Sequence, residues 1–310
     1  MPMLNKVVIF GVGLIGGSFA RSLKKAGAVG SVVGMGRSAA SLKRAQELGI
    51  IDVIGVADAG GGGCTMAEAL EGADLVLLAA PVAQTEPILA AIAPHLQPGT
   101  VVTDAGSTKS DVVASARRAL GGKIAQFVPG HPIAGRETNG PEAAIDDLYV
   151  GKKVVLTALD ENAEADVERV AAAWRACDAI IHRLTPQEHD KVFAAVSHLP
   201  HLLAYALVDD IANKPHADLL FQYAASGFRD FTRIAGSSPE MWRDISLANQ
   251  SALLTELDSY LAQLTGLRAR LAAGDGAGLE SVYNNAQRAR HQWITAIEAA
   301  EAPPSQANDV

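Results

Sequence analysis

The sequence has little cysteine, few aromatic residues and no unbroken apolar run long enough to cross a membrane. Only two of its 310 residues are cysteines, and Cys64 and Cys177 are too far apart for a metal or redox motif. They indicate ordinary thiols in a reducing compartment, and no cleavage site follows the short apolar run near the N-terminus. We therefore expect a cytoplasmic protein without a membrane span.

The sequence also lacks any block of like charge. The formal net charge is −8, which argues against a nucleic-acid partner, because such a partner requires a basic face. Apolar residues make up 49% of the chain and charged residues 19%. This composition predicts a packed core, and the length favours two domains.

Strand-like and helix-like segments alternate through the first half. This alternation is typical of βαβ units and predicts an α/β, Rossmann-type doubly wound parallel sheet. Ser38 is a candidate N-cap and Gly49 a candidate C-terminal stop for one of the helices. The expected strands are 6–10, 31–35, 73–81, 99–106, a strand with its exit loop over 125–132, and 152–158. The expected helices between them are 17–26, 38–49, 85–96 and 107–120.

The pattern changes after about residue 160. A helix over 161–178 and a short strand over 179–184 precede a region with helical signals only, including a long helix over 186–212 with Pro200 as a candidate kink. So many apolar helices cannot all bury their faces within one chain, which predicts a homodimer. The expected divisions are a dinucleotide-binding domain over 1–184, an all-helical substrate and dimerisation domain over 185–300, and a disordered tail over 301–310.

A glycine motif follows the first strand and opens the first helix. Gly11 and Gly13 permit a tight turn and a close backbone approach, and Gly16 permits the helix to pack on the strand. The diphosphate of a dinucleotide would lie at the helix N-terminus, where N–H groups are free. The cofactor-binding residues expected in this half are Gly11, Gly13, Leu14, Ile15, Gly16, Arg37, Ser38 and Pro81.

The residues after the second strand bear on the choice of cofactor. An NAD site favours an acidic residue about 20 positions beyond the glycine motif, to bind the ribose 2′-hydroxyl. Gly36 stands there, followed by Arg37 and Ser38, and an arginine with a hydroxyl suits a 2′-phosphate. The sequence therefore favours NADP and leaves NAD open.

Polar residues follow two of the later strands at the carboxyl edge of the expected sheet. Ser107, in "DAGSTKS", is a helix N-cap, an active-site hydroxyl or both, and Lys109 is a solvated lysine or an active-site cation. His131, in the loop "VPGHP", is flanked by glycine and proline. One imidazole presented by a rigid loop suits a general base, so we predict that His131 is catalytic.

The helical half carries two further sets of polar residues. His198 and His201, in "SHLPH" after Ser197, share one helix face and either line a cleft or are core histidines; without a third ligand they predict no metal site. Arg229 and Arg233, four apart, either clamp a carboxylate or form surface salt bridges to Asp230 or Asp244. The remaining histidines are expected to be solvated or structural: His95, His182, His189, His216 and His291.

Taken in order, "GVGLIGGS", "DAGSTK", "GHPIAG", "SHLPH", "FRDFTRIA" and "PEMWRDI" resemble the prephenate/arogenate (cyclohexadienyl) dehydrogenases of tyrosine biosynthesis over about residues 5–295. The resemblance implies a Rossmann-type domain with a helical dimerisation domain, and oxidative decarboxylation of prephenate, of arogenate or of both. It implies that His131 takes the proton of the substrate hydroxyl and that Ser107 binds that hydroxyl. It also implies that His201 and Arg233 bind the substrate. We expect the neighbouring residues of the same motifs to belong to the substrate-binding set as well: Ser197, His198 and Arg229.

Three alternatives remain open. An arogenate-specific enzyme is the first, although Gln222 offers no charge for arogenate's ammonium group. A β-hydroxyacid dehydrogenase of the 6-phosphogluconate type would need a catalytic lysine in the helical domain, and none stands in "SHLPH". A nucleotide sensor without chemistry would not need His131 for its function.

Overall fold

The computed structural model describes residues 2–56 and 63–301. The predicted disordered tail lies outside the described residues apart from its first residue. The contacts divide the chain into two compact units, Met1–Leu253 and Leu254–Val310. Every candidate site residue belongs to the first unit.

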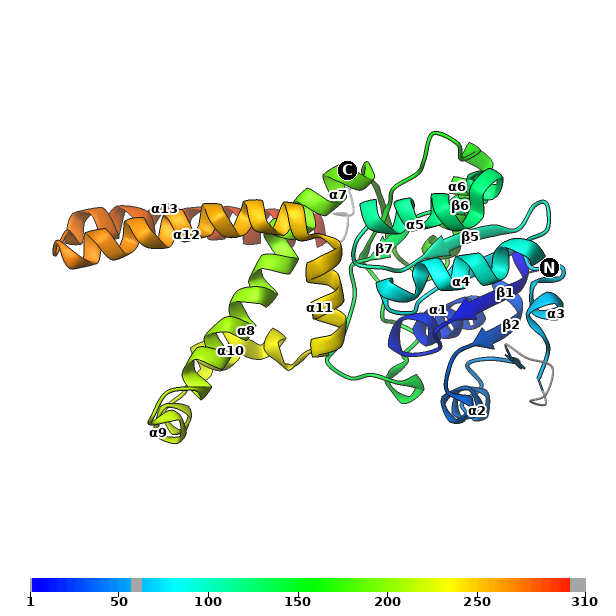
Figure 1. Ribbon diagram of the computed structural model, residues 1–310, viewed down its shortest axis with the longest axis horizontal. Helices are drawn as coiled ribbons and strands as arrows, with labels where there is room; N and C mark the ends of the chain where they lie inside the picture. Colours follow the sequence, from blue (N-terminus) through cyan, green and yellow to red (C-terminus); the bar gives the residue numbers. More distant parts are fainter. Residues whose placement is uncertain (1, 57–62, 302–310) are drawn as a thin grey trace, which may run out of the picture. The chain divides into compact units, whose positions relative to one another are not determined.

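The first unit is built on a six-stranded parallel sheet (Figure 1). The strand order is β3-β2-β1-β4-β5-β6, with Val7 paired to Val32 on one side and to Leu75 on the other. This order confirms the predicted doubly wound sheet, whose ligands bind at the carboxyl edge where the order reverses. The strands are β1 (Leu4–Phe10), β2 (Val29–Met35), β3 (Val53–Gly55), β4 (Leu75–Leu78), β5 (Val101–Asp104) and β6 (Phe127–Val128).

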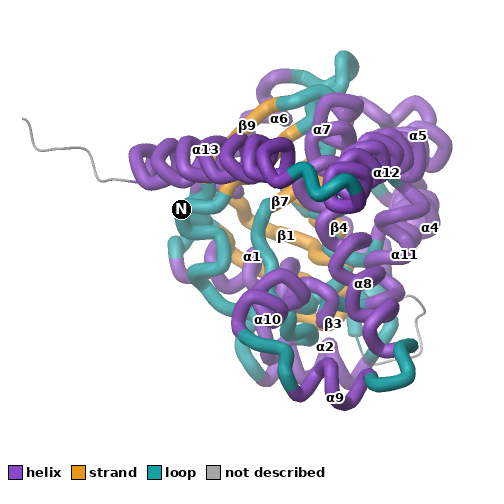
Figure 2. The backbone as a smooth tube through the Cα atoms, turned by 90° about the vertical axis from the view of Figure 1, so that its left-hand side faces the viewer, coloured by secondary structure: helices purple, strands orange, loops and turns teal. Residues whose placement is uncertain are grey.

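Helices cover both faces of this sheet (Figure 2). Alternate residues of β1 face opposite sides, so Val7 and Ile9 enter one apolar cluster and Val8 and Phe10 the other. The first cluster includes α1 (Leu14–Lys25), α2 (Ala39–Glu47) and α6 (Glu164–Arg175), and the second includes α3 (Met66–Leu70), α4 (Thr85–Ile92) and α5 (Ser110–Leu120).

A second, three-stranded sheet holds the segment predicted to continue the first one. Its order is β7 (Gly130–Pro132), β8 (Lys153–Leu156) and β9 (Ile180–Arg183), with β7 antiparallel to β8. The prediction of a strand and its exit loop over 125–132, followed by a further strand of the same sheet over 152–158, was therefore wrong for 130–132 and 152–158. Pro129 cannot donate to a parallel ladder, and its carbonyl instead accepts from Thr157 beyond β8.

The region after Pro186 is helical, as predicted. The long helix is interrupted by a π-helical turn over Ala194–His198, just before Pro200, which cannot donate to the carbonyl four residues earlier. The helices are α7 (Pro186–Phe193), α8 (Leu199–Ala212), α9 (Ala217–Gln222), α10 (Ser226–Thr232), α11 (Pro239–Ala248), α12 (Gln250–Ala272) and α13 (Gly276–Glu301).

One helix in the described part of the chain, Pro186–Ala212, is long and apolar enough to cross a membrane by length and composition alone. A single helix of this kind is weak evidence, since core helices of soluble proteins pass the same test.

Candidate active site

The glycine turn between β1 and α1 allows a close approach of the backbone only where its three glycines stand. Gly11 has a φ of +94°, and a Cβ on it would lie 2.6 Å from the Ala79 carbonyl oxygen. A Cβ on Gly16 would lie 2.2 Å from the Gly11 carbonyl oxygen, whereas a Cβ on Gly13 would meet nothing within 4 Å. The turn is therefore packed against its surroundings at Gly11 and Gly16 and open at Gly13.

The first turn of α1 can hold an anion. Its N-cap is Gly13, and no described side chain caps the helix, so its first N–H groups and its dipole are available to a phosphate. Leu14 is buried, and the Ile15 carbonyl accepts a hydrogen bond from the Tyr149 hydroxyl at 2.6 Å. Pro81 follows β4 at the carboxyl edge of the sheet. These residues fit a bound dinucleotide.

The loop after β2 presents a cation and no carboxylate. Gly36, Arg37 and Ser38 are exposed. The Ser38 hydroxyl accepts the Ser41 N–H at 3.2 Å, which confirms the predicted N-cap of α2. Gly49, with a φ of +70°, follows the end of that helix as expected.

A buried ion pair lies after β5. The Lys109 side chain is fully buried, forms an ion pair with the Asp104 carboxylate and donates to the Gly130 carbonyl at 2.9 Å. Asp104 also accepts from the N–H groups of Gly106 and Gly130, at 2.8 and 3.0 Å. Lys109 is therefore not the solvated lysine that the sequence allowed. It locks the loop after β5 to β7, next to His131.

The cap of α5 comes from a distant segment, and Ser107 is not that cap. The helix begins at Ser110, and the Asp190 carboxylate accepts the N–H groups of Lys109 and Ser110, both at 2.8 Å. Of the two alternatives for Ser107, the N-cap is therefore excluded, because α7 packs against α5 and carries a carboxylate to this end of it. Ser107 is half-buried in the turn before Lys109.

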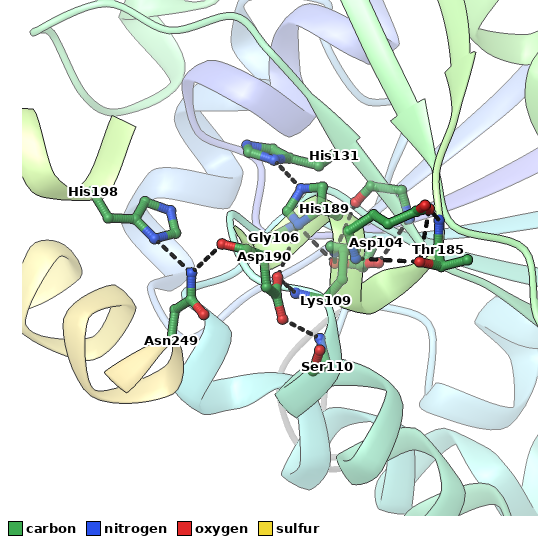
Figure 3. Close-up of polar contacts among 12 residues, drawn as sticks. Asp104, Gly106, Lys109, Ser110, His131, Thr185, His189, Asp190, His198 and Asn249 are labelled. Carbon is green, nitrogen blue, oxygen red and sulfur yellow. Dashed lines mark hydrogen bonds and ion pairs between the residues drawn. The ribbon is translucent and has the colours of Figure 1, made fainter. Parts of the chain in front are cut away.

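His131 is a buried residue of β7 rather than part of a strand's exit loop. Its Nδ1 lies 2.8 Å from Nε2 of His189, and Nδ1 of His189 lies 2.9 Å from the Asp190 carboxylate (Figure 3). Phe193 packs on both imidazole rings. His189 was expected to be solvated or structural; it is fully buried and not solvated, and α7 places it directly behind His131.

Burial keeps these imidazoles neutral. Burial, and after it the electrostatic influence of His189 and Lys109, holds the pKa of His131 well below its ordinary value. Burial also lowers the pKa of His189, although its hydrogen bond to Asp190 opposes this effect. Burial disfavours the Asp190 carboxylate, but hydrogen bonds from His189 and Ser110 outweigh it and lower the pKa of Asp190. A neutral His131 is ready to accept a proton at neutral pH.

His198 has an unused donor. The Asn249 amide nitrogen donates to the Asp190 carbonyl at 2.8 Å and lies 3.0 Å from Nδ1 of His198, so Nδ1 is an acceptor and the proton is on Nε2. Burial lowers the pKa of His198 to about 4, opposed by the nearby Asp190 and by the Ser107 backbone, and its Nε2 makes no hydrogen bond of normal geometry among the described atoms. A buried donor without a partner is costly, and a ligand oxygen could supply the missing acceptor.

His201 lies on the same face as His198, as predicted, because both rings contact Trp242. The His201 ring stacks on Trp242 with ring centres 3.5 Å apart, and the His198 ring meets it edge-on. Nδ1 of His201 donates to the Ser197 carbonyl at 2.8 Å, which leaves Nε2 as an acceptor when the ring is neutral. Burial, opposed by this hydrogen bond, lowers the pKa of His201, and the charge of Arg233 adds to the lowering.

Arg229 lies on α10, and Arg233 is the C-cap of the same helix. Helix α10 ends at Thr232, and Arg233 begins a 3₁₀ turn. Arg233 donates to the Glu137 carboxylate at 2.8 Å, rather than to Asp230 or Asp244. Arg229 is exposed on α10. The loop after β7, which carries Glu137, thus reaches the guanidinium group that lies near His201.

Sequence reasoning missed His189, Asp190 and Asn249. His189 and Asp190 are adjacent and follow a capping box at Thr185, but nothing in the sequence indicates that α7 meets α5. Asn249 separates α11 from α12 and shows no motif. Within the described residues, no group of three or more His, Cys, Asp or Glu side chains could hold a metal ion.

The fold and the site together are those of a nucleotide-dependent dehydrogenase: a doubly wound sheet with an open glycine turn, and a buried neutral imidazole beyond the carboxyl edge. The sequence matches the family models for the nucleotide-binding domain of prephenate dehydrogenase, over residues 19–183, and for its dimerization domain, over residues 185–284. The chain therefore belongs to the prephenate dehydrogenase family and is an oxidoreductase, which confirms the resemblance inferred from the motifs.

Individual relatives agree with this assignment. The cyclohexadienyl dehydrogenase of Zymomonas mobilis is 35% identical, over 94% of this chain and 96% of the relative. The prephenate dehydrogenase of Bacillus subtilis is 33% identical, over 92% of this chain and 75% of the relative. The structure of Aquifex aeolicus prephenate dehydrogenase with hydroxyphenyl propionate and NAD+ has a TM-score of 0.84 at 35% identity, covering 93% of this chain and 98% of that one.

Proposed function

We propose that this enzyme oxidises and decarboxylates prephenate to 4-hydroxyphenylpyruvate, with hydride transfer to NADP or NAD, as a step of tyrosine biosynthesis. The observation that carries the proposal is the buried, neutral His131, with its Nδ1 bonded to His189, in a chain of the prephenate dehydrogenase family. The relatives named for prephenate and for cyclohexadienyl substrates support this substrate class. Use of arogenate is the alternative, supported by the likeness to Synechocystis arogenate dehydrogenase, with a TM-score of 0.76 at 28% identity.

The proposed chemistry needs one base. His131 takes the proton of the substrate's C4 hydroxyl, which allows C4 to release hydride as its oxygen forms a carbonyl. Loss of the ring carboxylate as carbon dioxide then leaves an aromatic phenolate, which takes back the proton held by His131 to give the phenol. The nicotinamide cofactor, when bound, supplies the hydride acceptor. Ser107 binds the same hydroxyl and holds it toward the imidazole.

The polar residues around His131 would position the substrate. Arg233 would exchange its exposed pair with Glu137 for a substrate carboxylate, since a guanidinium group binds carboxylates in two-pronged fashion. His198 would donate its unpaired Nε2–H to a substrate oxygen. His201, Ser197 and Arg229 complete this proposed substrate-binding set.

The glycine turn, with Gly11, Gly13 and Gly16, would hold the cofactor's diphosphate beside Leu14, Ile15 and Pro81. The proposal favours NADP, because Arg37 and Ser38 are exposed where an acidic residue would bind the NAD ribose. NAD stays an alternative, and it is the cofactor in the Aquifex aeolicus complex.

The helical region would form a homodimer. Leu261, Leu264 and Leu271 are between 42% and 70% exposed in the second unit, and the family's matching domain is a dimerization domain. We assign the nucleotide to residues 1–184 and the substrate and subunit contacts largely to 185–300. The two free thiols are consistent with a cytoplasmic enzyme, for which we propose neither a membrane nor a nucleic-acid partner.

Initial rates of nicotinamide reduction test the proposal. Prephenate and arogenate are each paired with NADP and NAD, on purified protein. We expect turnover of prephenate, fastest with NADP. Turnover of arogenate alone would support the arogenate-specific alternative. No turnover in any of the four pairs, with nucleotide still bound, would contradict the proposed function and favour a sensor.

A further inference from the structure

We propose that His189 and Asp190 are positioning residues that fix the tautomer of His131, so that its Nε2 is the atom that accepts the proton. The inference rests on the proposed function for its catalytic consequence, but the tautomer itself follows from the geometry. The family resemblance assigns no role to either residue.

The direction of each hydrogen bond in the series His131–His189–Asp190 follows from its last member, the Asp190 carboxylate. An ionised Asp190 carboxylate can only accept, so Nδ1 of His189, 2.9 Å away, carries a proton. A neutral His189 then has a lone pair on Nε2, and Nδ1 of His131, 2.8 Å away, must donate to it. A neutral His131 is left with its lone pair on Nε2, which Figure 3 shows on the side of the ring away from His189.

Asp190 is itself held in place from three sides. Its carboxylate accepts the N–H groups of Lys109 and Ser110 at the start of α5, and its carbonyl accepts from the Asn249 amide. The N-terminus of a helix also favours an anion. The carboxylate is thus fixed in position and kept ionised, as the orienting role requires.

Asp190 also offsets the charge that forms during the reaction. A proton on Nε2 makes His131 a buried imidazolium, close to the Lys109 ammonium group and to His198. Lys109 is already paired with Asp104, and His198 is neutral at about pH 7. The Asp190 carboxylate, reached through His189, is therefore the anion linked to the imidazolium by hydrogen bonds.

Two measurements on four variants test the inference. Nitrogen-15 NMR of histidine-labelled protein reports which ring nitrogen of His131 carries the proton, with His131→Asn used to assign the signal. Steady-state kinetics separates kcat from KM. The variants are Asp190→Asn, His189→Leu, His189→Gln and the matched control His182→Gln, which changes an exposed histidine of β9.

We expect the proton on Nδ1 of His131 in the unaltered enzyme. An amide at position 190 can donate to Nδ1 of His189 and reverse both hydrogen bonds, so Asp190→Asn should move the proton of His131 to Nε2 and lower kcat by about 10- to 1,000-fold. KM should change little. His189→Leu should lower kcat similarly. His189→Gln should keep most of the kcat of the unaltered enzyme, because its amide oxygen can still accept from Nδ1 of His131. His182→Gln should leave both constants unchanged.

A proton found on Nε2 of His131 in the unaltered enzyme would overturn the inference, as would full kcat in His189→Leu. Asp190→Asn could fail to fold because α5 loses its cap. The NMR spectrum of the unaltered enzyme and the kcat values of the two His189 variants then still test the positioning role. An enzyme that turns over none of the substrate pairs would refute the proposed function while leaving the tautomer measurable. Normal turnover in every variant would refute the positioning role alone.

Discussion

Aliphatic side chains of strand β1, in the first unit of this chain, are buried, and those of the second unit are largely exposed. In β1, the side chains of Val7, Val8 and Ile9 are fully buried, whereas Leu271, in the second unit, is 70% exposed. Full burial of such a side chain stabilises a fold by about 1.5–3 kcal/mol. The comparison teaches that one chain completes the nucleotide-binding sheet, whereas its terminal helices need another surface, which we propose is a second copy.

Two tryptophans offer the largest test of this contrast. Trp174 is fully buried, with ring centres 4.5 Å from Phe19 and 5.0 Å from Tyr149, whereas Trp293 on α13 is 59% exposed. Trp174→Ala should therefore lower the free energy of unfolding by about 3–5 kcal/mol, measured by urea denaturation. Trp293→Ala should lower it by less than about 1 kcal/mol at concentrations where the chain is monomeric, and sedimentation should show weaker self-association. Equal losses from both changes in the monomer would contradict the contrast.

The glycine turn allows the fold and the nucleotide site to be separated. A methyl group at Gly13 meets no protein atom within 4 Å, so Gly13→Ala should lower the free energy of unfolding by no more than about 1 kcal/mol, the cost of alanine at a helix N-cap. It should nevertheless raise the nucleotide Kd by about tenfold or more, because a methyl group obstructs close approach of the diphosphate. Calorimetric titration with NADP measures this Kd.

Gly122→Ala is the matched control, since its methyl group also meets nothing and the residue lies outside the turn. Unchanged nucleotide affinity in Gly13→Ala would refute the assignment of this turn.

Arg233 tests the substrate half of the site. Arg233→Ala should raise the KM for prephenate by about 10- to 100-fold, the loss expected for a charge-assisted hydrogen bond, with kcat changed much less. Arg243→Ala, which removes another exposed and ion-paired arginine, is the control and should not change KM. A fall in kcat at constant KM would assign Arg233 to the transition state instead.

Replacement of Arg37 should have the smallest effect of these changes, because an exposed side chain contributes little to cofactor binding. Arg37→Ala should raise the KM for NADP by about fivefold, the upper range for a solvent-exposed ion pair, and should leave the KM for NAD unchanged. Lys43→Ala, a neighbouring exposed cation on α2, controls for the general loss of positive charge. Equal changes for the two cofactors would argue against contact with a 2′-phosphate.

The sequence was sufficient for the first sheet because its signals are local. Apolar runs alternate with amphipathic helices, and the glycine turn follows β1 directly, so the doubly wound parallel sheet and its nucleotide edge could be predicted, but not the order of its strands. The short elements β3 and α3, of three and five residues, carry too little pattern to be recognised. The separate sheet of β7, β8 and β9 depends on a partner far along the chain, and a single residue, Pro129, marks the change.

The site was predictable only where a residue belongs to a recognisable motif. His131, Ser107, His201 and Arg233 were proposed from such motifs, and their roles are still predictions. Asp190 could not be found, because its contacts with Lys109 and Ser110 span 81 and 80 residues. The orientation of a buried imidazole depends on such long-range contacts, which leave no spacing in the sequence.

The most direct test of the account is the steady-state turnover of His131→Asn with prephenate, measured beside the unaltered enzyme. The account predicts a fall in kcat of about 10²- to 10⁴-fold, the range for loss of a general base. Nucleotide affinity should be unchanged, because the glycine turn lies elsewhere on the sheet edge. Turnover close to that of the unaltered enzyme would contradict the assignment of His131 as the base.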